Sequence, residues 1–337
     1  MARIHFLNVN EGDCSIIQHE NGNVSMIDIC CGNIEIEDHT NCSSVDLKET
    51  ILGNYHQKET PTNPISYLSN IGVSTIFRYI QTHPDMDHMD GLQKLKDSFE
   101  IINFWDTDNT KKQKFDEKGK NGLYLKKDWD CYQKLRQSKN TPKALLYYDG
   151  SRAKYFAKDE NGELLDDYLQ VLAPTKELIK TANDIGDWND SSYVILYHIH
   201  GFKVLFCGDA DMKTINHLLR DHKKDVANID VLIAPHHGRD SDKDFAFLDI
   251  MCPQLTLFGN AKSKHLAYDK WNSRGLKHIT SNQAGNILIE FKDDAFYLSV
   301  SNKTFADRYC KSRGCTLLRN SQFNSYWRIL ECSVNII

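Results

Sequence analysis

Nowhere does the sequence contain an apolar run long enough to cross a membrane, and its first residues lack the pattern of a signal peptide. Met1–Phe6 leads directly into strand-like sequence. These two absences argue against a membrane-spanning or exported protein and predict a chain that works in the cytoplasm.

An excess of basic residues is also missing. Lys and Arg number 41 against 46 Asp and Glu, for a net charge of -5. A globally basic nucleic-acid binder is therefore excluded, and any contact with nucleic acid must use a local patch. The 337 residues, 40% hydrophobic and 26% charged, have the composition of a soluble globular protein of one large domain or two.

The ten cysteines form no recognisable framework, because the sequence contains no CxxC pair. Cys30 and Cys31 are adjacent, and Cys310 and Cys315 lie five positions apart. Scattered cysteines in a chain that is not exported are most often reduced core residues. They favour neither a disulfide scaffold nor a structural zinc site.

What the sequence does have is a crowded turn at residues 82–92. It places two histidines and three carboxylates between His83 and Asp90, after the apolar run Ile76–Ile80 and before a helical pattern. Carboxylates this close repel one another unless a positive charge neutralises them, and imidazole and carboxylate are ordinary ligands of a divalent metal. The alternative is a solvated acidic turn that caps a helix.

Three further polar groups follow apolar strands. Asp28 lies inside the strand Val24–Ile29, near its end, as a site residue or an edge residue. Asp209 follows Phe202–Cys207, and His236 and His237 follow Val231–Ala234. Strand ends along one edge of a sheet meet in a common cleft, where site residues collect. The sequence therefore predicts that these side chains join those of the turn.

Two polar segments and the C-terminal tail interrupt this pattern. Residues 33–72 and 106–165 read as insertions, and in the second of them lysines alternate with aromatic residues. Such a mixture can bind single-stranded nucleic acid or can be an ordinary solvated insertion. Residues 301–337 carry an excess of four positive charges among aromatic residues.

Taken together, the motifs resemble those of metallo-β-lactamase-fold hydrolases, and within them the hydrolase domain of the DNA-uptake channel protein ComEC and its soluble relatives. Residues 82–91 are similar to that family's Ser-His-Pro-Asp-x-Asp-His-x-x-Gly. The other matching segments are Phe6–Asp13, Met26–Asp28, Asn189–Val194, Phe206–Ala210 and Pro235–Gly238.

The resemblance implies an α/β fold, an αββα sandwich over residues 1–300, with 301–337 as an extension packed on or beside it. It implies a site for two divalent ions, Zn²⁺ or Mn²⁺, with Mg²⁺ as a further option. The implied ligands are His83, Asp85, Asp87, His88, Asp209 and His237, with Asp209 bridging. Asp28, Asn189 and Ser192 would support these ligands from behind.

The sequence departs from the general pattern of the superfamily at two ligand positions. Asp85 stands where a lactamase has a histidine, as in the ComEC branch, and no histidine occupies the third ligand position, where Asn189 or Asp190 stands. Oxygen ligands favour hard cations, so Mn²⁺ and Mg²⁺ suit the site as well as Zn²⁺ does.

The function expected from these residues is metal-dependent hydrolysis of a phosphodiester in nucleic acid or a nucleotide. Asp87 and Asp209 would serve the catalytic metals, and either His236 or His265 would protonate the leaving group. One alternative is hydrolysis of a carbon ester, a thioester or a lactam. Another is a metal-binding protein that docks a protein partner through its insertions or its tail.

Overall fold

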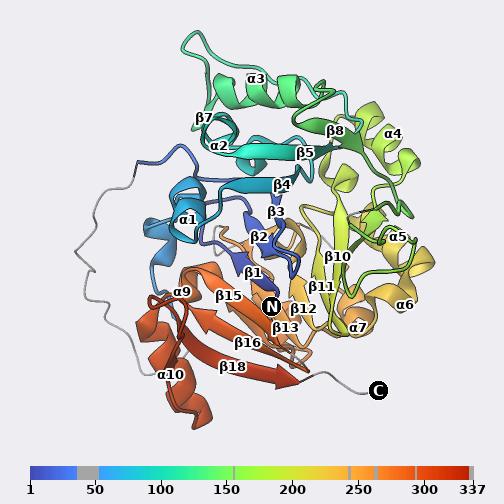
Figure 1. Ribbon diagram of the computed structural model, residues 1–337. Helices are drawn as coiled ribbons and strands as arrows, with labels where there is room; N and C mark the ends of the chain where they lie inside the picture. Colours follow the sequence, from blue (N-terminus) through green and yellow to red (C-terminus); the bar gives the residue numbers. More distant parts are fainter. Residues whose placement is uncertain (36–52, 155, 242–243, 262–264, 293, 334–337) are drawn as a thin grey trace.

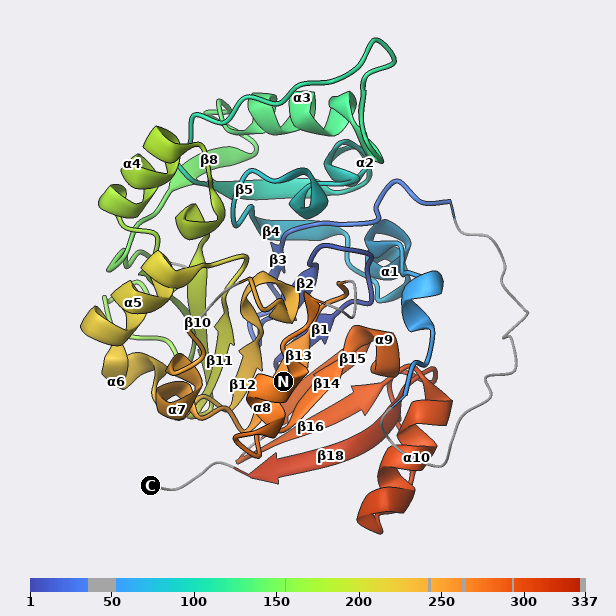
Figure 2. The same ribbon diagram turned by 180° about the vertical axis from the view of Figure 1, so that it is seen from behind.

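The computed structural model describes residues 1–35, 53–154, 156–241, 244–261, 265–292 and 294–333, which form two large β-sheets (Figures 1 and 2). The first sheet has ten strands in the order β17 (Leu318–Arg319), β18 (Trp327–Ser333), β16 (Ala295–Val300), β15 (Ile287–Lys292), β1 (Arg3–Phe6), β2 (Ser15–Gln18), β3 (Val24–Ile27), β4 (Thr75–Ile80), β5 (Glu100–Asp106) and β8 (Lys143–Leu146). The second has six, in the order β14 (His278–Thr280), β13 (Leu255–Phe258), β12 (Val231–Ile233), β11 (Phe202–Phe206), β10 (Val194–Ile199) and β9 (Asp167–Ala173).

Each sheet has a parallel part whose carboxyl ends carry polar loops. In the first sheet β3, β4, β5 and β8 are parallel neighbours, and Ile27 pairs with Ile80 at the ends of β3 and β4. In the second, β11 to β14 are parallel, and Phe206 pairs with Ile233. The segments that follow these strands therefore begin at matching levels, as the sequence predicted.

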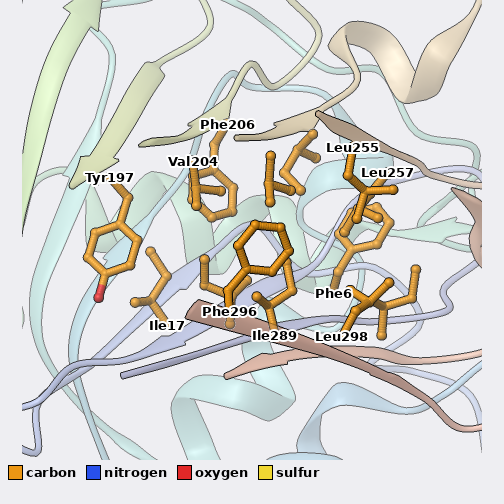
Figure 3. Packing of buried hydrophobic residues seen from close by; sticks show 14 of the residues in the cluster. Phe6, Ile17, Tyr197, Val204, Phe206, Leu255, Leu257, Ile289, Phe296 and Leu298 are labelled. Atoms are coloured by element: carbon orange, nitrogen blue, oxygen red, sulfur yellow. The ribbon is translucent and has the colours of Figure 1, made fainter. Parts of the chain in front are cut away.

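The inner faces of the two sheets pack against each other. Figure 3 shows Phe6, Ile17 and Ile289 of the first sheet against Tyr197, Val204 and Leu257 of the second. Strand β10 is buried on both faces, because Ile195 and Tyr197 point to this core while Val194 and Leu196 point outward. This double burial explains its nearly continuous apolar sequence.

Helices cover the outer faces. On the first sheet lie α1 (Pro64–Asn70), α2 (Leu92–Ser98) and α3 (Lys126–Leu135); on the second lie α5 (Met212–Asp221), α6 (Lys223–Val226), α7 (Phe247–Met251) and α8 (Tyr268–Asn272). Helices α4 (Lys176–Ile185), α9 (Ser281–Ala284) and α10 (Lys303–Arg313) complete the set, with four 3-10 turns at Gln57–Glu59, Met86–His88, Asn189–Ser191 and Pro235–Gly238. The layers confirm the predicted αββα sandwich. No helix of the described segments is long and apolar enough to cross a membrane.

The segments expected as insertions and tail take distinct structures. Of 33–72, residues 36–52 lie outside the described residues, and the rest carries a 3-10 turn and α1. Segment 106–165 holds the hairpin β6 (Lys120–Asn121) and β7 (Tyr124–Leu125), then α3 and β8. The tail packs α10 on the inter-sheet core and adds β18 beside β16, so the first sheet continues past Val300.

Candidate metal centre

The loops at the carboxyl ends of β3, β4, β11 and β12 bring the predicted side chains together. Asp28, His236 and His237 have φ values of 57°, 54° and 56°, in the left-handed region that residues with a side chain seldom adopt. Such backbone is retained where the surrounding structure enforces it, and it clusters at functional sites. Three of the residues that end these strands therefore have costly conformations.

Asp209 is the centre of the cluster. Its Oδ1 lies 3.2 Å from Nε2 of His88 and 3.4 Å from Nε2 of His237. Its Oδ2 lies 3.9 Å from Nε2 of His83. All four side chains are buried, so three imidazoles surround one carboxylate away from water.

The donor atoms of this cluster fit a divalent metal. Within the described ranges, Oδ1 of Asp209 and the Nε2 atoms of the three surrounding histidines are buried without a hydrogen-bond partner. Buried polar atoms in folded proteins are otherwise almost always paired. Three groups of side chains could each hold an ion, because the ligand atoms within each group lie within 4.8 Å of one another. These groups are His83/His88/Asp209, Asp87/His88/His237 and Asp13/Asp209/His237. Imidazole nitrogens and carboxylate oxygens are the donors that such ions take.

The electrostatics show why a cation belongs here. Burial lowers the pKa of His83 to about 3, so this imidazole is neutral. Burial also disfavours the charged form of His237, but Asp209 and Asp13 outweigh it and raise the pKa of that imidazole to about 10. Burial alone would raise the pKa of Asp209, yet His237 and His88 hold it well below its usual range. The carboxylate therefore stays charged, and protonated histidines supply the positive charge that a metal would otherwise provide.

Two carboxylates outside the cluster orient its histidines. Asp28 accepts a hydrogen bond from Nδ1 of His88 at 2.7 Å and is itself fixed by the backbone N–H of Thr82. Asp13 lies 3.2 Å from Nδ1 of His237. Both contacts leave Nε2 of the histidine directed at Asp209, which is how metal-binding histidines are usually held.

Replacing Asp28 with asparagine is expected to weaken metal binding by about 10–100-fold, the usual cost of losing a carboxylate that orients a ligand histidine. The amide keeps the shape of the side chain but removes the charge opposite the His88 ring. Competition with a metal chelator measures this affinity. Metal affinity equal to that of the wild type would show that Asp28 does not set the ring of His88.

Asp85 and Asp87 lie on the more open side of the cluster. Asp85 is 3.9 Å from Nε2 of His83 and forms an ion pair with Lys111, which comes from segment 106–165. The Lys111 ammonium also lies 5.0 Å from the ring centroid of Trp188. Asp87 shares a group with His88 and His237. The positive charge of Lys111 thus lies at the rim of the site.

The remaining predicted residues lie at different distances from the cluster. His236 places Nε2 3.6 Å from Asp209, and Oγ of Ser192 accepts the backbone N–H of Asp209 at 3.3 Å. Asn189 contacts the Asp211 carboxylate at 3.4 Å. His265 is exposed, and its carbonyl accepts the N–H of Asp240, so its side chain is not brought into the cluster.

Asp190 does not serve as the third ligand, at the position where the superfamily has a histidine and this sequence has none. Its Oδ1 accepts the backbone N–H groups of Asp211 and Thr214 at the start of α5. That carboxylate therefore satisfies donors of the first helical turn. Asp13 and Lys111 are the site residues that the sequence reasoning did not single out. Asp13 is the last residue of the matching segment Phe6–Asp13, whereas Lys111 is one of several lysines in a segment of mixed charge.

A cavity of about 800 Å³ lies beside the cluster. Both polar segments contribute to its wall, through Lys58 and Glu59 and through Leu123 to Leu125. Asp87 is close enough to raise the pKa of Tyr124, to which burial contributes most. Cys30 and Asp90, each two positions from a residue of the site, line the same cavity.

No family model and no curated protein matches the chain, but solved structures resemble it in fold. CmlA, a diiron β-hydroxylase from Streptomyces venezuelae, is similar over 86% of this chain and 54% of its own, at 9% identity and a TM-score of 0.44. The chain thus spans about half the length of CmlA. A protein from Parabacteroides distasonis described as a metal-dependent hydrolase is similar over 82% of this chain and 91% of its own, at 12% identity and a TM-score of 0.41. The Rm3 metallo-β-lactamase is similar over 69% and 75%, at 11% identity and a TM-score of 0.34.

Proposed function

We propose that the protein is a metal-dependent hydrolase that cleaves a phosphodiester, in nucleic acid or in a nucleotide, at a site for two divalent ions. The observation that carries this proposal is the set of three buried imidazoles whose unpaired Nε2 atoms surround the Asp209 carboxylate. A purely structural core would pair these atoms or replace them with apolar groups.

The residues divide into two sets around Asp209. His83 and His88 would hold one ion, and Asp87 and His237 would hold the other, with Asp209 between them. Two bound divalent ions supply Lewis acidity and a water of lowered pKa, the chemistry of dinuclear hydrolases. Asp28 and Asp13 keep the Nε2 atoms of His88 and His237 directed inward.

Phosphodiesters are favoured because of the charge at the rim. The Lys111 ammonium lies over Trp188 and beside Asp85, so a cation and an aromatic face flank the entrance. A phosphodiester carries a negative charge that the ammonium can bind, whereas thioesters and carbon esters offer it no charge at the bond that breaks. The motif resemblance to the ComEC hydrolase domain supports the same choice.

His236 suits the role of proton donor to the leaving group. It is partly exposed, with Nε2 3.6 Å from Asp209 and Nδ1 3.8 Å from Asp211. A group that protonates a departing oxygen must reach it from the edge of the site, within hydrogen-bond distance of the bound substrate. His265 is directed into solvent, so His236 is the better of the two candidates.

The cavity of about 800 Å³ would accept the organic group next to the phosphate, such as a base with its sugar. Tyr124 and Leu125 offer apolar surface to a ring.

The test is a cleavage assay on single- and double-stranded DNA, RNA and cyclic dinucleotides, with nitrocefin and a thioester as comparison substrates. Activity on at least one phosphodiester is expected, lost on treatment with a chelator and restored by Zn²⁺, Mn²⁺ or Mg²⁺. Turnover of only nitrocefin or the thioester would reject the phosphodiester assignment, and turnover that withstands the chelator would reject the metal.

Replacing Lys111 with methionine is expected to raise KM for the phosphodiester about 10-fold or more, because a hydrogen bond to a charged group is lost from the entrance. Lys112→Met is the matched control, since Lys112 is the exposed neighbour in the same segment. Steady-state kinetics of both variants measure the effect. An equal KM in the two variants would remove Lys111 from substrate binding.

A further inference from the structure

A second cluster of histidines and carboxylates lies at the far end of α5. His217 is on α5, His222 joins α5 to α6, and Asp149 follows β8 in the chain (Figure 1). Helix α5 begins next to the candidate metal centre, and at a rise of about 1.5 Å per residue His217 lies about 8 Å and His222 about 15 Å along the helix from its start. The cluster is therefore separate from that centre.

The Asp149 carboxylate faces the Nε2 atoms of both histidines. Its Oδ1 lies 2.8 Å from Nε2 of His222, and its Oδ2 lies 3.3 Å from Nε2 of His217. Ligands bound at about 2.0–2.1 Å to a tetrahedral zinc ion are separated from one another by about 3.3 Å. The two measured separations are close to this value, and the ligand atoms of all three residues lie within 4.8 Å of one another.

Each histidine has its other ring nitrogen held by a carboxylate of its own. Nδ1 of His217 lies 2.9 Å from Asp221, four positions later, and Nδ1 of His222 lies 3.0 Å from Asp225, three positions later. Zinc-binding histidines are usually fixed by such an outer carboxylate, which receives the Nδ1 proton and leaves Nε2 with its lone pair. Here the arrangement occurs twice, and both Nε2 atoms face the same third carboxylate.

The charge of the cluster also suits a divalent cation. With neutral imidazoles, three carboxylates (Asp149, Asp221 and Asp225) are opposed by the Arg220 guanidinium, which is bound to Asp221 at 2.6 Å. The Lys203 ammonium also lies near Asp225, so one negative charge remains for a bound cation to balance. Nε2 of His217 donates a hydrogen bond to the carbonyl of Leu172 at 3.1 Å, and a bound zinc ion would take the place of that proton. His222 and Asp149 are partly exposed, which gives an ion access from solvent.

We propose that Asp149, His217 and His222 form a zinc site distinct from the catalytic centre. Two imidazoles and one carboxylate are a donor set that zinc accepts, and nitrogen donors select it over magnesium and calcium. The bound ion would join the segment after β8 to α5 and α6, three parts of the chain that hydrogen bonds and packing alone now hold together.

The experiment uses the full-length protein loaded with Zn²⁺ and freed of excess metal. Zinc per chain is measured by mass spectrometry, and crystals are examined by anomalous scattering at the zinc edge. We expect His222→Gln to bind one zinc fewer than the wild type and to lose an anomalous peak between the three residues, while the peaks at Asp209 remain. His200→Gln is the control, because His200 is a partly exposed histidine paired with Glu20 elsewhere on the surface.

An unchanged zinc count in His222→Gln, with no peak at Asp149 in the wild type, would overturn the proposal and leave a network of hydrogen bonds. Asp149→Asn serves as the second variant if His222→Gln does not fold, since Asp149 lies in a surface turn. If Asp149→Asn lowers the melting temperature by the same amount with zinc as without it, the proposed zinc site would likewise be overturned. The number of zinc ions bound at this cluster does not depend on turnover. The test of the zinc site is therefore separate from the test of the proposed hydrolase activity.

Discussion

Asp209→Ala is expected to lower kcat/KM for the phosphodiester by at least ~10³-fold, which corresponds to about 4 kcal/mol of transition-state stabilisation. The reason is its central position, because its two oxygens face the Nε2 atoms of His83, His88 and His237. This carboxylate would lie between the two proposed sets of ligands, so its loss would remove negative charge that balances the proposed ions. Metal content and turnover should therefore fall together.

Asp230→Asn is the matched control for this variant. Asp230 is also a buried carboxylate, but it precedes β12, at the opposite end of the strand from His236, and binds the N–H of Lys203 and the amide of Gln254. The Asp230→Asn substitution should lower the free energy of unfolding and leave turnover by the folded protein unchanged. Zinc or manganese should raise the melting temperature of the wild type and of Asp230→Asn. The increase should be smaller for Asp209→Ala. Full activity in Asp209→Ala would contradict the site.

The sequence allowed the core of the site to be predicted because each of its residues follows a short apolar strand. Asp28, Asp209 and His237 come after β3, β11 and β12, and parallel strands end at one edge of a sheet. This prediction needs only the local pattern of a short apolar strand followed by a polar residue. The αββα sandwich follows from the same order of apolar strands and amphipathic helices. In the structure His88 contacts both Asp28 and Asp209, and His237 lies 3.4 Å from Asp209.

Contacts that depend on long segments could not be predicted in this way. Lys111 reaches Asp85 and Trp188 from the irregular stretch that follows β5, and no period in its sequence indicates that path. Likewise Asp149 meets His217 and His222, 68 and 73 positions later in the chain, because the turn after β8 is bonded to β9 and its end, and α5 contacts the same strand.

The C-terminal tail shows a further reason why a strand can go unpredicted from the sequence. Strand β18 pairs with β16 through Leu330 and Leu298, yet charged residues such as Arg328 interrupt its apolar sequence. The Arg328 guanidinium lies 4.2 Å from the ring centroid of Tyr297 and so covers an aromatic face of the neighbouring strand. A strand at this position needs only one apolar face, so its period-two pattern is weak.

Gly91→Ala is expected to lower the free energy of unfolding by about 3 kcal/mol, the sum of a left-handed backbone and a steric clash. Gly91 has a φ of +100°, and a Cβ there would lie 2.3 Å from Cα of Gly32. That approach joins two backbones, since Gly32 donates its N–H to the carbonyl of Asp90 and Ile29 donates to that of His88. Backbone on both sides leaves no flexible side chain that could move away.

Gly72→Ala separates the two causes. Gly72 has a φ of +77°, but nothing lies within 4 Å of a Cβ placed there, so only the backbone cost of about 1 kcal/mol applies. Denaturant unfolding of both variants gives the difference, and chelator competition shows whether metal affinity falls with stability in Gly91→Ala alone. Equal losses in the two variants would mean that the loop carrying His88 can shift away from Gly32 at little cost. A larger loss in Gly91→Ala, accompanied by weaker metal binding, would mean that the glycine ending the motif fixes His88 and Asp87 by letting two backbones touch, and takes no part in the chemistry itself.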